Sequence, residues 1–155
     1  MQIHYQKTIP FSAEEYQKKQ AELEEQIQLR KEVIERLKTA REMGDLSENG
    51  AYHAAKFELG NIGRRIRYLK EMINTGYIAA VSQAQVAGFG KTVTLKNETD
   101  TLVITLVSLH ESDLATQKIS LESPLGKAVA GKKVGESVSV HAPRGTVEYT
   151  VVTIV

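Results

Sequence analysis

The feature that most constrains this fold is a pair of heptad-like runs separated by a short polar turn. In the second run, apolar residues recur at spacings of three and four, the pattern of a helix that packs along a partner helix. Its members are Tyr52, Ala55, Leu59, Ile62, Ile66, Leu69 and Ile73. The first run has the same rhythm in Tyr16, Leu23, Ile27, Ile34 and Leu37, with Gln20 and Arg30 at the two remaining positions. The partner helix is therefore present in the same chain.

An antiparallel hairpin fixes which residues of the two runs face each other. The predicted pairs are Leu37 with Ala55, Ile34 with Leu59, Ile27 with Ile66, and Leu23 with Leu69. Their common midpoint falls near Leu46, inside the polar turn Gly44–Glu48. We call the apolar stripe along which the two helices pack the seam. The seam and the polar turn thus indicate the same structure, a helical hairpin with Asp45 and Glu48 at its tip.

The residues of the turn suit this position. Gly44 is typical of the left-handed residue that follows a helix, and Asp45 or Ser47 can cap the helix that comes next. Each arm has about 30 residues, so at ~1.5 Å per residue the hairpin is expected to be roughly 45 Å long. A hairpin of this length is an extended arm that can reach into another molecule, rather than a compact domain.

The ends of the two helices carry their own signals. Ser12 followed by Glu15 predicts a capping box that opens the first helix, which runs to about Met43, and the second helix ends near residues 74–76. Acidic residues of the first helix lie level with basic residues of the second in the predicted register, which favours exposed interhelical ion pairs. These residues are Glu22, Glu24, Glu25, Glu32 and Glu35 on one side, and Arg64, Arg65, Arg67 and Lys70 on the other.

After residue 76 the pattern changes to short, β-branched, alternating runs separated by turn residues. Strands are predicted at 77–81, 91–96, 101–109, 117–121, 137–141 and 145–155, with a short helix at 124–130. The sequence therefore predicts an α+β protein. Residues 1–76 form a coiled-coil hairpin with its acidic tip at 44–48, and residues 77–155 form a small, mostly antiparallel β-sheet domain.

Composition excludes several classes of function. Twenty basic and nineteen acidic residues give a net charge of +1, so any nucleic-acid contact must be local. There is no cysteine, no signal segment and no apolar run of membrane-spanning length, and we expect a cytoplasmic protein without membrane contact. There is also no phosphate-binding loop, and the four scattered histidines do not have metal-ligand spacing. The chain shows no self-contained active site.

What remains is the pair Asp45 and Glu48 at the tip. Asp45-Leu46-Ser47-Glu48 is itself a capping box, so one interpretation is that both acids only open the second helix. The other is that two carboxylates at the end of a rod hold one side of a magnesium ion, which is commonly bound by one or two protein carboxylates. In two-metal phosphodiester hydrolysis, such an ion activates the attacking water.

The tip segment 40–49 (AREMGDLSEN), continued by 52–56 (YHAAK), resembles the signature of the bacterial transcript cleavage factors, the Gre family, and its GreA branch in particular. Residues 119–136 resemble that family's second domain, and the likeness extends from about residue 10 to the end. The resemblance implies a hairpin that enters the secondary channel of RNA polymerase and an FKBP-like domain that docks outside it. It also implies an accessory factor, not an enzyme, that stimulates cleavage of backtracked RNA.

The resemblance assigns roles to individual residues. Asp45 and Glu48 match the acids that help hold the second Mg²⁺ of the polymerase, an ion that the factor does not bind stably alone. Arg41 and Lys56 match basic positions directed at the 3′ end of the nascent RNA, and we add Lys38 because it lies close to them. Such contacts weaken with salt. A monomer is expected.

The sequence departs from the family at Asn49-Gly50-Ala51, where members commonly carry a further acid before the tyrosine. This leaves open a factor that enters the channel and inhibits without cleaving. A third hypothesis is a chaperone or prolyl isomerase built on the C-terminal half, with the hairpin as a dimerisation device. Only Tyr77, Phe89 and Tyr149 are aromatic after residue 76, too few for an aromatic proline pocket, so we interpret that half as a docking module.

Overall fold

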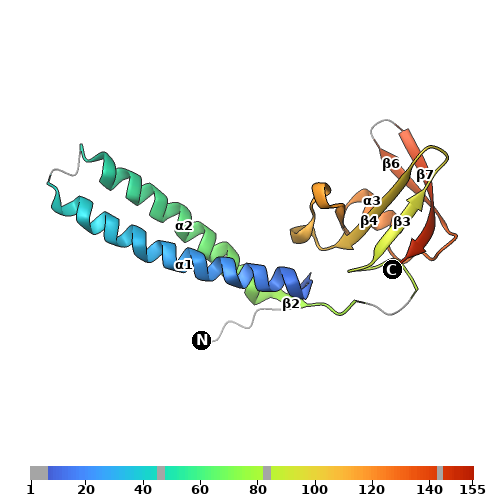
Figure 1. Cartoon of the computed structure of the whole chain (residues 1–155), viewed down its shortest axis with the longest axis horizontal. Coiled ribbons are helices and arrows are strands. Elements are labelled where there is room, and N and C mark those ends of the chain that lie inside the picture. Colours follow the sequence, from blue (N-terminus) through green and yellow to red (C-terminus); the bar gives the residue numbers. More distant parts are fainter. Residues whose placement is uncertain (1–6, 45–47, 82–84, 143–144) are drawn as a thin grey trace. The chain divides into compact units, whose positions relative to one another are not determined.

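The structure is a computed structural model that describes residues 7–44, 48–81, 85–142 and 145–155. It divides into two compact units (Figure 1). The first is built on Glu14–Tyr77, and the second on Ile78–Val155 together with the short segment Ile9–Ala13. An N-terminal segment and the C-terminal half of the chain thus contribute to the same unit.

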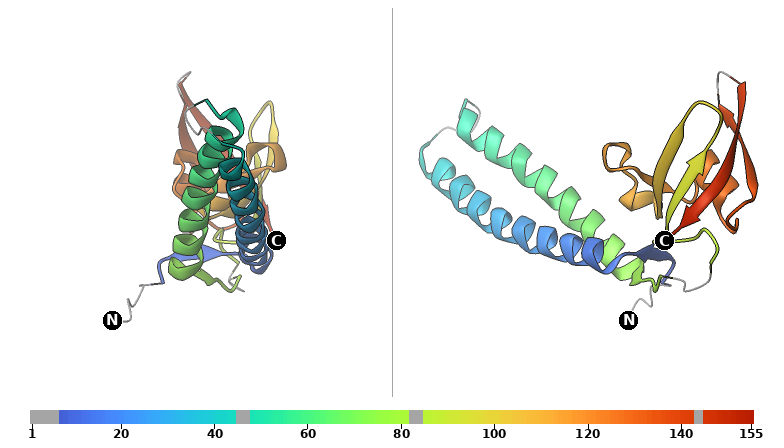
Figure 2. Two further views of the ribbon diagram at one scale, coloured as in Figure 1. Left: turned by 90° about the vertical axis from the view of Figure 1, so that its left-hand side faces the viewer. Right: turned by 45° about the vertical axis from the view of Figure 1, so that its right-hand side comes forward.

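The first unit is a hairpin of two long helices, as the sequence predicts. Helix α1 spans Ala13–Glu42 and helix α2 spans Gly50–Thr75. They lie side by side in opposite directions in every view (Figures 1 and 2). With 30 residues, α1 is ~45 Å long at the usual rise per residue. The described residues between the two helices, 43–44 and 48–49, lie at the end of this arm.

On α2 the buried stripe follows the predicted seam. Ala55, Ile62, Ile66 and Leu69 are all buried, and Met72 adds a further buried side chain near the end of the helix.

On α1 the predicted seam is partly wrong. Val33, which the heptad pattern passes over, is fully buried, and Ala40 is buried as well, whereas Ile27 is 36% exposed. Leu29, Val33 and Leu37 all pack in the interhelical cluster and are spaced by four residues. An α-helix with 3.6 residues per turn drifts by about 20° per heptad from a strict repeat of seven. The stripe of α1 follows the helix period rather than the heptad.

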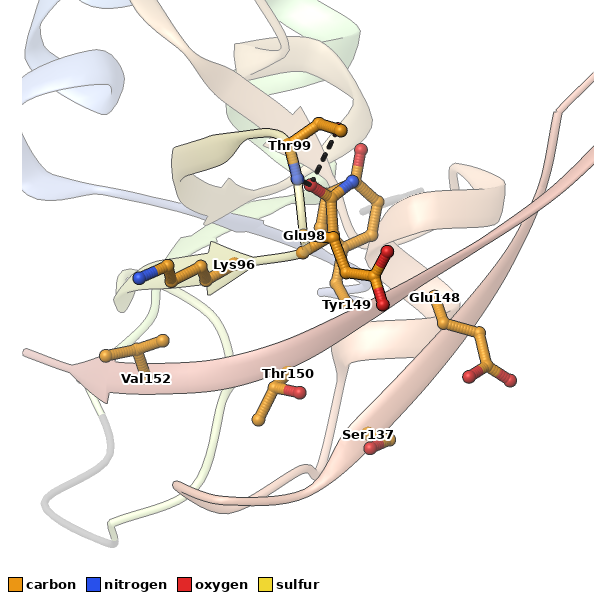
Figure 3. A pocket seen from close by; sticks show the side chains of 9 residues that line it. Lys96, Glu98, Thr99, Ser137, Glu148, Tyr149, Thr150 and Val152 are labelled. Carbon is orange, nitrogen blue, oxygen red and sulfur yellow. Dashed lines mark hydrogen bonds between the residues drawn. The ribbon is translucent and has the colours of Figure 1, made fainter.

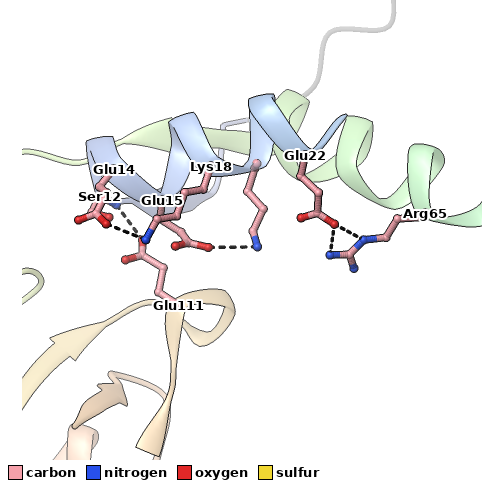
Figure 4. A network of polar contacts seen from close by, with 8 residues as sticks. Ser12, Glu14, Glu15, Lys18, Glu22, Arg65 and Glu111 are labelled. Carbon is pink, nitrogen blue, oxygen red and sulfur yellow. Dashed lines mark hydrogen bonds and ion pairs between the residues drawn. The ribbon is translucent and has the colours of Figure 1, made fainter. Parts of the chain in front are cut away.

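Polar contacts fasten the hairpin along its length. Arg65 on α2 donates from Nε to Oε1 of Glu22 on α1 at 2.6 Å (Figure 4), which confirms one of the predicted interhelical pairs. Lys7 closes the base, because its Nζ donates to the carbonyl oxygens of Ile73 and Gly76 at 3.2 and 2.7 Å. These carbonyls belong to the end of α2, where a cation is favoured by the helix dipole.

The second unit holds a five-stranded sheet in the order β5-β4-β3-β7-β6. Its strands are β3 (Thr92–Lys96), β4 (Thr101–Val107), β5 (Lys118–Ser120), β6 (Ser137–Ala142) and β7 (Gly145–Ile154). β3 pairs antiparallel with both β4 and β7, β6 pairs antiparallel with β7, and β5 runs parallel to β4. Strand β4 ends at Val107 because a 3₁₀ turn, Leu109–Glu111, follows. The predicted α+β class is confirmed.

One face of this sheet is apolar. Alternate residues of its strands are buried, including Val93, Leu95, Ile104, Leu106, Val138 and Val151. Helix α3 (Pro124–Val129) adds the fully buried Val129 to the same core. Gly126 allows α3 to approach closely, because a Cβ at that position would lie 2.0 Å from the carbonyl oxygen of Ser120. The core of the unit therefore lies between α3 and this face of the sheet.

Two short strands complete the described structure. β1 (Ile9–Phe11) and β2 (Gly76–Ile78) form a two-stranded sheet, so β2 is shorter than the predicted strand 77–81. The side chain of Phe11 is fully buried, and its ring lies 6.2 Å from that of His110. The backbone N–H of Ser12 donates to the carboxylate of Glu111 (Figure 4). These contacts hold Ile9–Ala13 in the second unit.

Candidate functional site

The turn at the end of the hairpin is organised by a glycine and an asparagine. Helix α1 ends at Glu42, and Gly44 follows with φ of +110°, a backbone conformation that favours glycine. Helix α2 begins at Gly50, and its N-cap is Asn49, whose Oδ1 accepts from the backbone N–H of Tyr52 at 3.1 Å. The expectation for Gly44 is confirmed, whereas the prediction that Asp45 or Ser47 caps α2 is wrong.

Asn49 also connects the two helices. Its Nδ2 donates to the carbonyl oxygen of Ala40 in the last turn of α1 at 2.7 Å. One side chain therefore satisfies a donor at the start of α2 and an acceptor at the end of α1, two of the groups that helix ends leave unpaired. This gives the tip a fixed point immediately beside the acidic segment.

The position of the cap decides what Glu48 can do. A capping box at 45–48 would place Glu48 inside the first turn of α2, but Glu48 precedes the N-cap and lies outside the helix. Its side chain is exposed. Asp45, the other predicted ligand, lies outside the described residues. The carboxylate of Glu48 is thus presented to solvent at the end of the arm.

The ion pairs show which flank of the hairpin each residue occupies. Arg36 Nη2 lies 2.8 Å from Glu58 Oε1, and each of these residues immediately precedes a seam residue of its helix. The same holds for Glu22 and Arg65. Antiparallel helices are related by a two-fold axis perpendicular to their common plane, so equivalent positions on both lie on the same side. This side is the pairing flank, defined by these two ion pairs.

The predicted RNA-binding residues lie on the other side. Lys38, Arg41 and Lys56 immediately follow the seam residues Leu37, Ala40 and Ala55, respectively. By the same symmetry they share one side of the hairpin close to the tip, which we call the basic flank. Arg41 and Lys56 are exposed, while Lys38 makes an exposed ion pair with Glu35 of its own helix at 2.7 Å.

The basic flank continues toward the base of the hairpin. Arg67 and Lys70 follow the buried Ile66 and Leu69, and both are exposed. The predicted register favoured interhelical pairs with acids for these two residues. Their place immediately after Ile66 and Leu69, which the sequence already predicts as seam residues, is the signal that puts them on the same side as Lys56.

A small apolar groove lies between the helices just below the tip. It has a volume of about 470 Å³, and its lining includes the small residues Ala40, Ala51, Ala54 and Ala55. The groove is present because these side chains are too small to fill the space between the helices. Met43, 73% exposed, stands at its edge. The groove shows that the hairpin is loosely packed next to the acidic segment.

The second unit has a larger open groove beside strands β3, β6 and β7 (Figure 3). Its volume is about 680 Å³, and it is lined by Lys96, Asn97, Glu98, Thr99, Ser137, Glu148, Tyr149, Thr150 and Val152. Asn97 shapes its rim by accepting from the backbone N–H of Thr99 at 2.9 Å. Tyr149 is the one aromatic side chain in this lining.

Two negative findings concern the described parts of the chain. No three His, Asp or Glu side chains gather there as a metal site. None of the helices there combines the length and apolarity needed to cross a membrane.

The chain thus combines an antiparallel helical hairpin, which has the exposed acid Glu48 at its tip, with a small β-sheet domain that follows in sequence. Residues 9–78 match the family "Transcription elongation factor, N-terminal", and residues 82–155 match "Transcription elongation factor, GreA/GreB, C-term". The chain belongs to the GreA/GreB family of transcription elongation factors.

Two relatives with similar sequences agree with this assignment. The chain is 40% identical over 150 residues to transcription elongation factor GreA of Thermosipho africanus, covering 95% of this chain and 96% of that protein. It is 42% identical over 149 residues to the GreA of Thermosipho melanesiensis, covering 94% and 96%. The solved structure of GreA factor homolog 1 of Thermus thermophilus is 28% identical, with 95% and 98% covered and a TM-score of 0.45.

Proposed function

We propose that this protein stimulates RNA polymerase to cleave backtracked RNA, acting as an accessory factor whose hairpin tip reaches the polymerase active centre. The observation that carries the proposal is the exposed carboxylate of Glu48 outside helix α2. A group at the end of an arm ~45 Å long can enter a narrow channel that a globular domain cannot. This role places the protein in the cytoplasm with the polymerase.

The tip suits a shared Mg²⁺ better than a metal of its own. Mg²⁺ prefers carboxylate oxygens and usually keeps several waters, so one or two acids provide part of a coordination sphere. Glu48 supplies an exposed carboxylate, and Asp45 is its proposed companion. When bound in a two-metal centre, Mg²⁺ supplies activation of the attacking water and stabilisation of developing charge. The factor would provide ligands, and the polymerase the rest of the site.

The basic flank supports a contact with RNA. Arg41 and Lys56 are exposed on the same side of the hairpin within the last turns before the tip, and Lys38 lies beside them. Cations in this position can hold phosphates of the 3′ segment of the transcript while the acids reach the bond to be cut. We therefore assign Arg41, Lys56 and Lys38 to RNA binding.

For the second unit, docking on the polymerase is better supported than prolyl isomerisation. A proline-binding pocket is expected to be apolar and aromatic, whereas the groove of this unit carries charged and hydroxyl side chains and a single tyrosine. The unit would hold the factor at the channel entrance while the hairpin acts inside.

The test uses purified RNA polymerase halted in a backtracked complex with radiolabelled RNA. We expect the wild-type protein to shorten the RNA, and Asp45→Ala and Glu48→Ala to abolish shortening while still competing with the wild type for the polymerase. Glu42→Ala is the matched control, because Glu42 is an exposed acid at the end of α1. Shortening that persists in both tip variants would refute the proposal. Slower synthesis without shortening by the wild type would identify an inhibitor instead.

A further inference from the structure

The hairpin carries a large aromatic side chain on its outer surface. Phe57 is 71% exposed, although phenylalanine is among the residues most often buried in folded proteins. It lies two positions after the seam residue Ala55 and two before Leu59. At about 100° per residue, this places Phe57 on the side of α2 opposite to α1. Packing within the hairpin therefore does not account for it.

The residues around Phe57 form a polar and open surface. One turn earlier lies His53, and one turn later lie Gly60 and Asn61, all of them exposed. A Cβ on Gly60 would be 3.9 Å from Nη1 of Arg64, so the Arg64 guanidinium reaches back along the helix toward Gly60. Its Nη2 donates to Oδ1 of Asn61. We call His53, Phe57, Gly60, Asn61 and Arg64 the Phe57 patch.

The charge near this patch is positive. Arg64 lies within it and Lys56 is adjacent in sequence, both exposed. The neighbouring acid, Glu58, is paired with Arg36 across the hairpin and so belongs to the pairing flank. An aromatic face next to a guanidinium and an open glycine is a combination with which proteins bind single-stranded nucleic acid. The base stacks on the ring, and the cation meets the phosphate.

We propose that the Phe57 patch binds a nucleotide of the single-stranded RNA extruded from the polymerase, with the base stacked on Phe57 and Arg64 directed at the adjoining phosphate. The inference rests on the proposed function, which brings the hairpin beside that RNA. It adds a contact next to the basic flank, centred on the side of α2 opposite to α1. Stacking is tolerant of sequence, so the contact would recognise any base.

The surroundings favour RNA over a protein partner. An apolar protein pocket would be matched by further apolar residues around Phe57, and the other four members of the patch are a histidine, a glycine, an asparagine and an arginine. The position also sets the length of RNA required. Phe57 is seven residues into α2, or ~10 Å from its start, which corresponds to about three stacked nucleotides.

The experiment measures equilibrium binding of the full-length protein to backtracked complexes in the absence of Mg²⁺, so that no RNA is cut. Complexes with one extruded nucleotide are compared with complexes that have six. Phe57→Tyr keeps an aromatic face, Phe57→Leu keeps apolar bulk without one, and Phe57→Ala removes both. Because Phe57 is exposed, none of these changes removes core packing, and circular dichroism checks the helices.

We expect Phe57→Ala and Phe57→Leu to weaken binding to the six-nucleotide complex by at least about fivefold, the lower end of what one base–aromatic stack provides. Phe57→Tyr should bind like the wild type, and all four proteins should bind the one-nucleotide complex equally. Equal binding of all four to both complexes would overturn the inference. Binding of Phe57→Leu with wild-type affinity would also overturn it and would indicate an apolar protein contact. The same is true if a variant loses as much affinity for the one-nucleotide complex as for the six-nucleotide complex.

This outcome is separable from the proposed function. Cleavage is measured with Mg²⁺ and depends on the tip acids, whereas the stacking contact is measured without it. If the wild type fails to cleave but shows the predicted length-dependent loss in the variants, the stacking inference stands and the cleavage proposal falls. If the wild type cleaves the RNA but the Phe57 variants bind both complexes as the wild type does, the cleavage proposal stands and the stacking inference falls.

Discussion

The backbone N–H of Ser12 donates a hydrogen bond of 2.7 Å to Oε1 of Glu111, an acidic residue that is only 5% exposed. Ser12 is the residue immediately before α1, and Glu111 ends a 3₁₀ turn 99 residues later. Together with the buried ring of Phe11, this bond makes Ile9–Ala13 a part of the second unit. The unit is therefore assembled from two separate stretches of the chain.

Replacing Glu111 tests this assembly. We expect Glu111→Ala to destabilise the second unit by about 1–3 kcal/mol, because the N–H of Ser12 loses its acceptor. Glu111→Gln keeps an acceptor oxygen and should retain more of the stability. Hydrogen exchange of the peptide segments around residues 9–13 and 104–112 checks the result. Unchanged protection of residues 9–13 in the Ala variant would show that this bond does not hold the segment.

Asn49 offers a test of how the tip is held. Asn49→Ala removes both the cap of α2 and the bond to the Ala40 carbonyl, and we expect destabilisation by about 1–2 kcal/mol, with faster hydrogen exchange at the start of α2. Asn49→Asp keeps a capping oxygen but cannot donate to Ala40. It should therefore protect α2 nearly as well as Asn while loosening the end of α1. Exchange at the end of α1 that is the same in Asn49→Asp as in the wild type would mean that the bond between the helices is unimportant.

The corrected seam of α1 makes a paired prediction for stability. Val33→Ala removes fully buried methyl groups and should lower the free energy of unfolding of the hairpin by about 1–2 kcal/mol. Ile27→Ala removes more carbon but from a side chain that is 36% exposed, so we expect a smaller decrease. Urea denaturation followed by far-ultraviolet circular dichroism compares them. A larger decrease in the free energy of unfolding for Ile27→Ala than for Val33→Ala would indicate that α1 packs along the strict heptad seam after all.

The basic flank predicts a salt-dependent interaction with RNA. We expect Arg41→Ala combined with Lys56→Ala to weaken binding to a backtracked complex. It should also reduce the slope of log affinity against log salt by about 0.7 for each phosphate that is no longer neutralised. Arg36→Ala is the control, because Arg36 lies on the pairing flank with Glu58. An unchanged slope in the double variant would remove Arg41 and Lys56 from the RNA-binding surface.

Much of this architecture follows from local sequence. The periodic apolar residues of α2 and the glycine at position 44 are local signals, and they predict an antiparallel hairpin with an acidic tip because helix period and turn chemistry act over a few residues. The change to alternating β-branched runs after residue 76 likewise indicates a sheet domain. The family resemblance extends these local signals to a function.

Other features were decided only when the chain folded. Val33 is buried in the seam and Ile27 is partly exposed because the line along which α1 meets α2 depends on both helices, and the pattern of α1 alone does not reveal it. Asn49 becomes the cap because its side chain can satisfy both Tyr52 and the Ala40 carbonyl on the neighbouring helix. Glu111 meets Ser12 across almost a hundred residues.

By itself the sequence determined the helices, the strands and the position of the acidic tip, since these depend on near neighbours. Tertiary structure decided which side chains are buried, which are paired and which, like Glu48 and Phe57, are left facing solvent. Those outcomes depend on contacts between segments far apart in the chain, and no local pattern contains them.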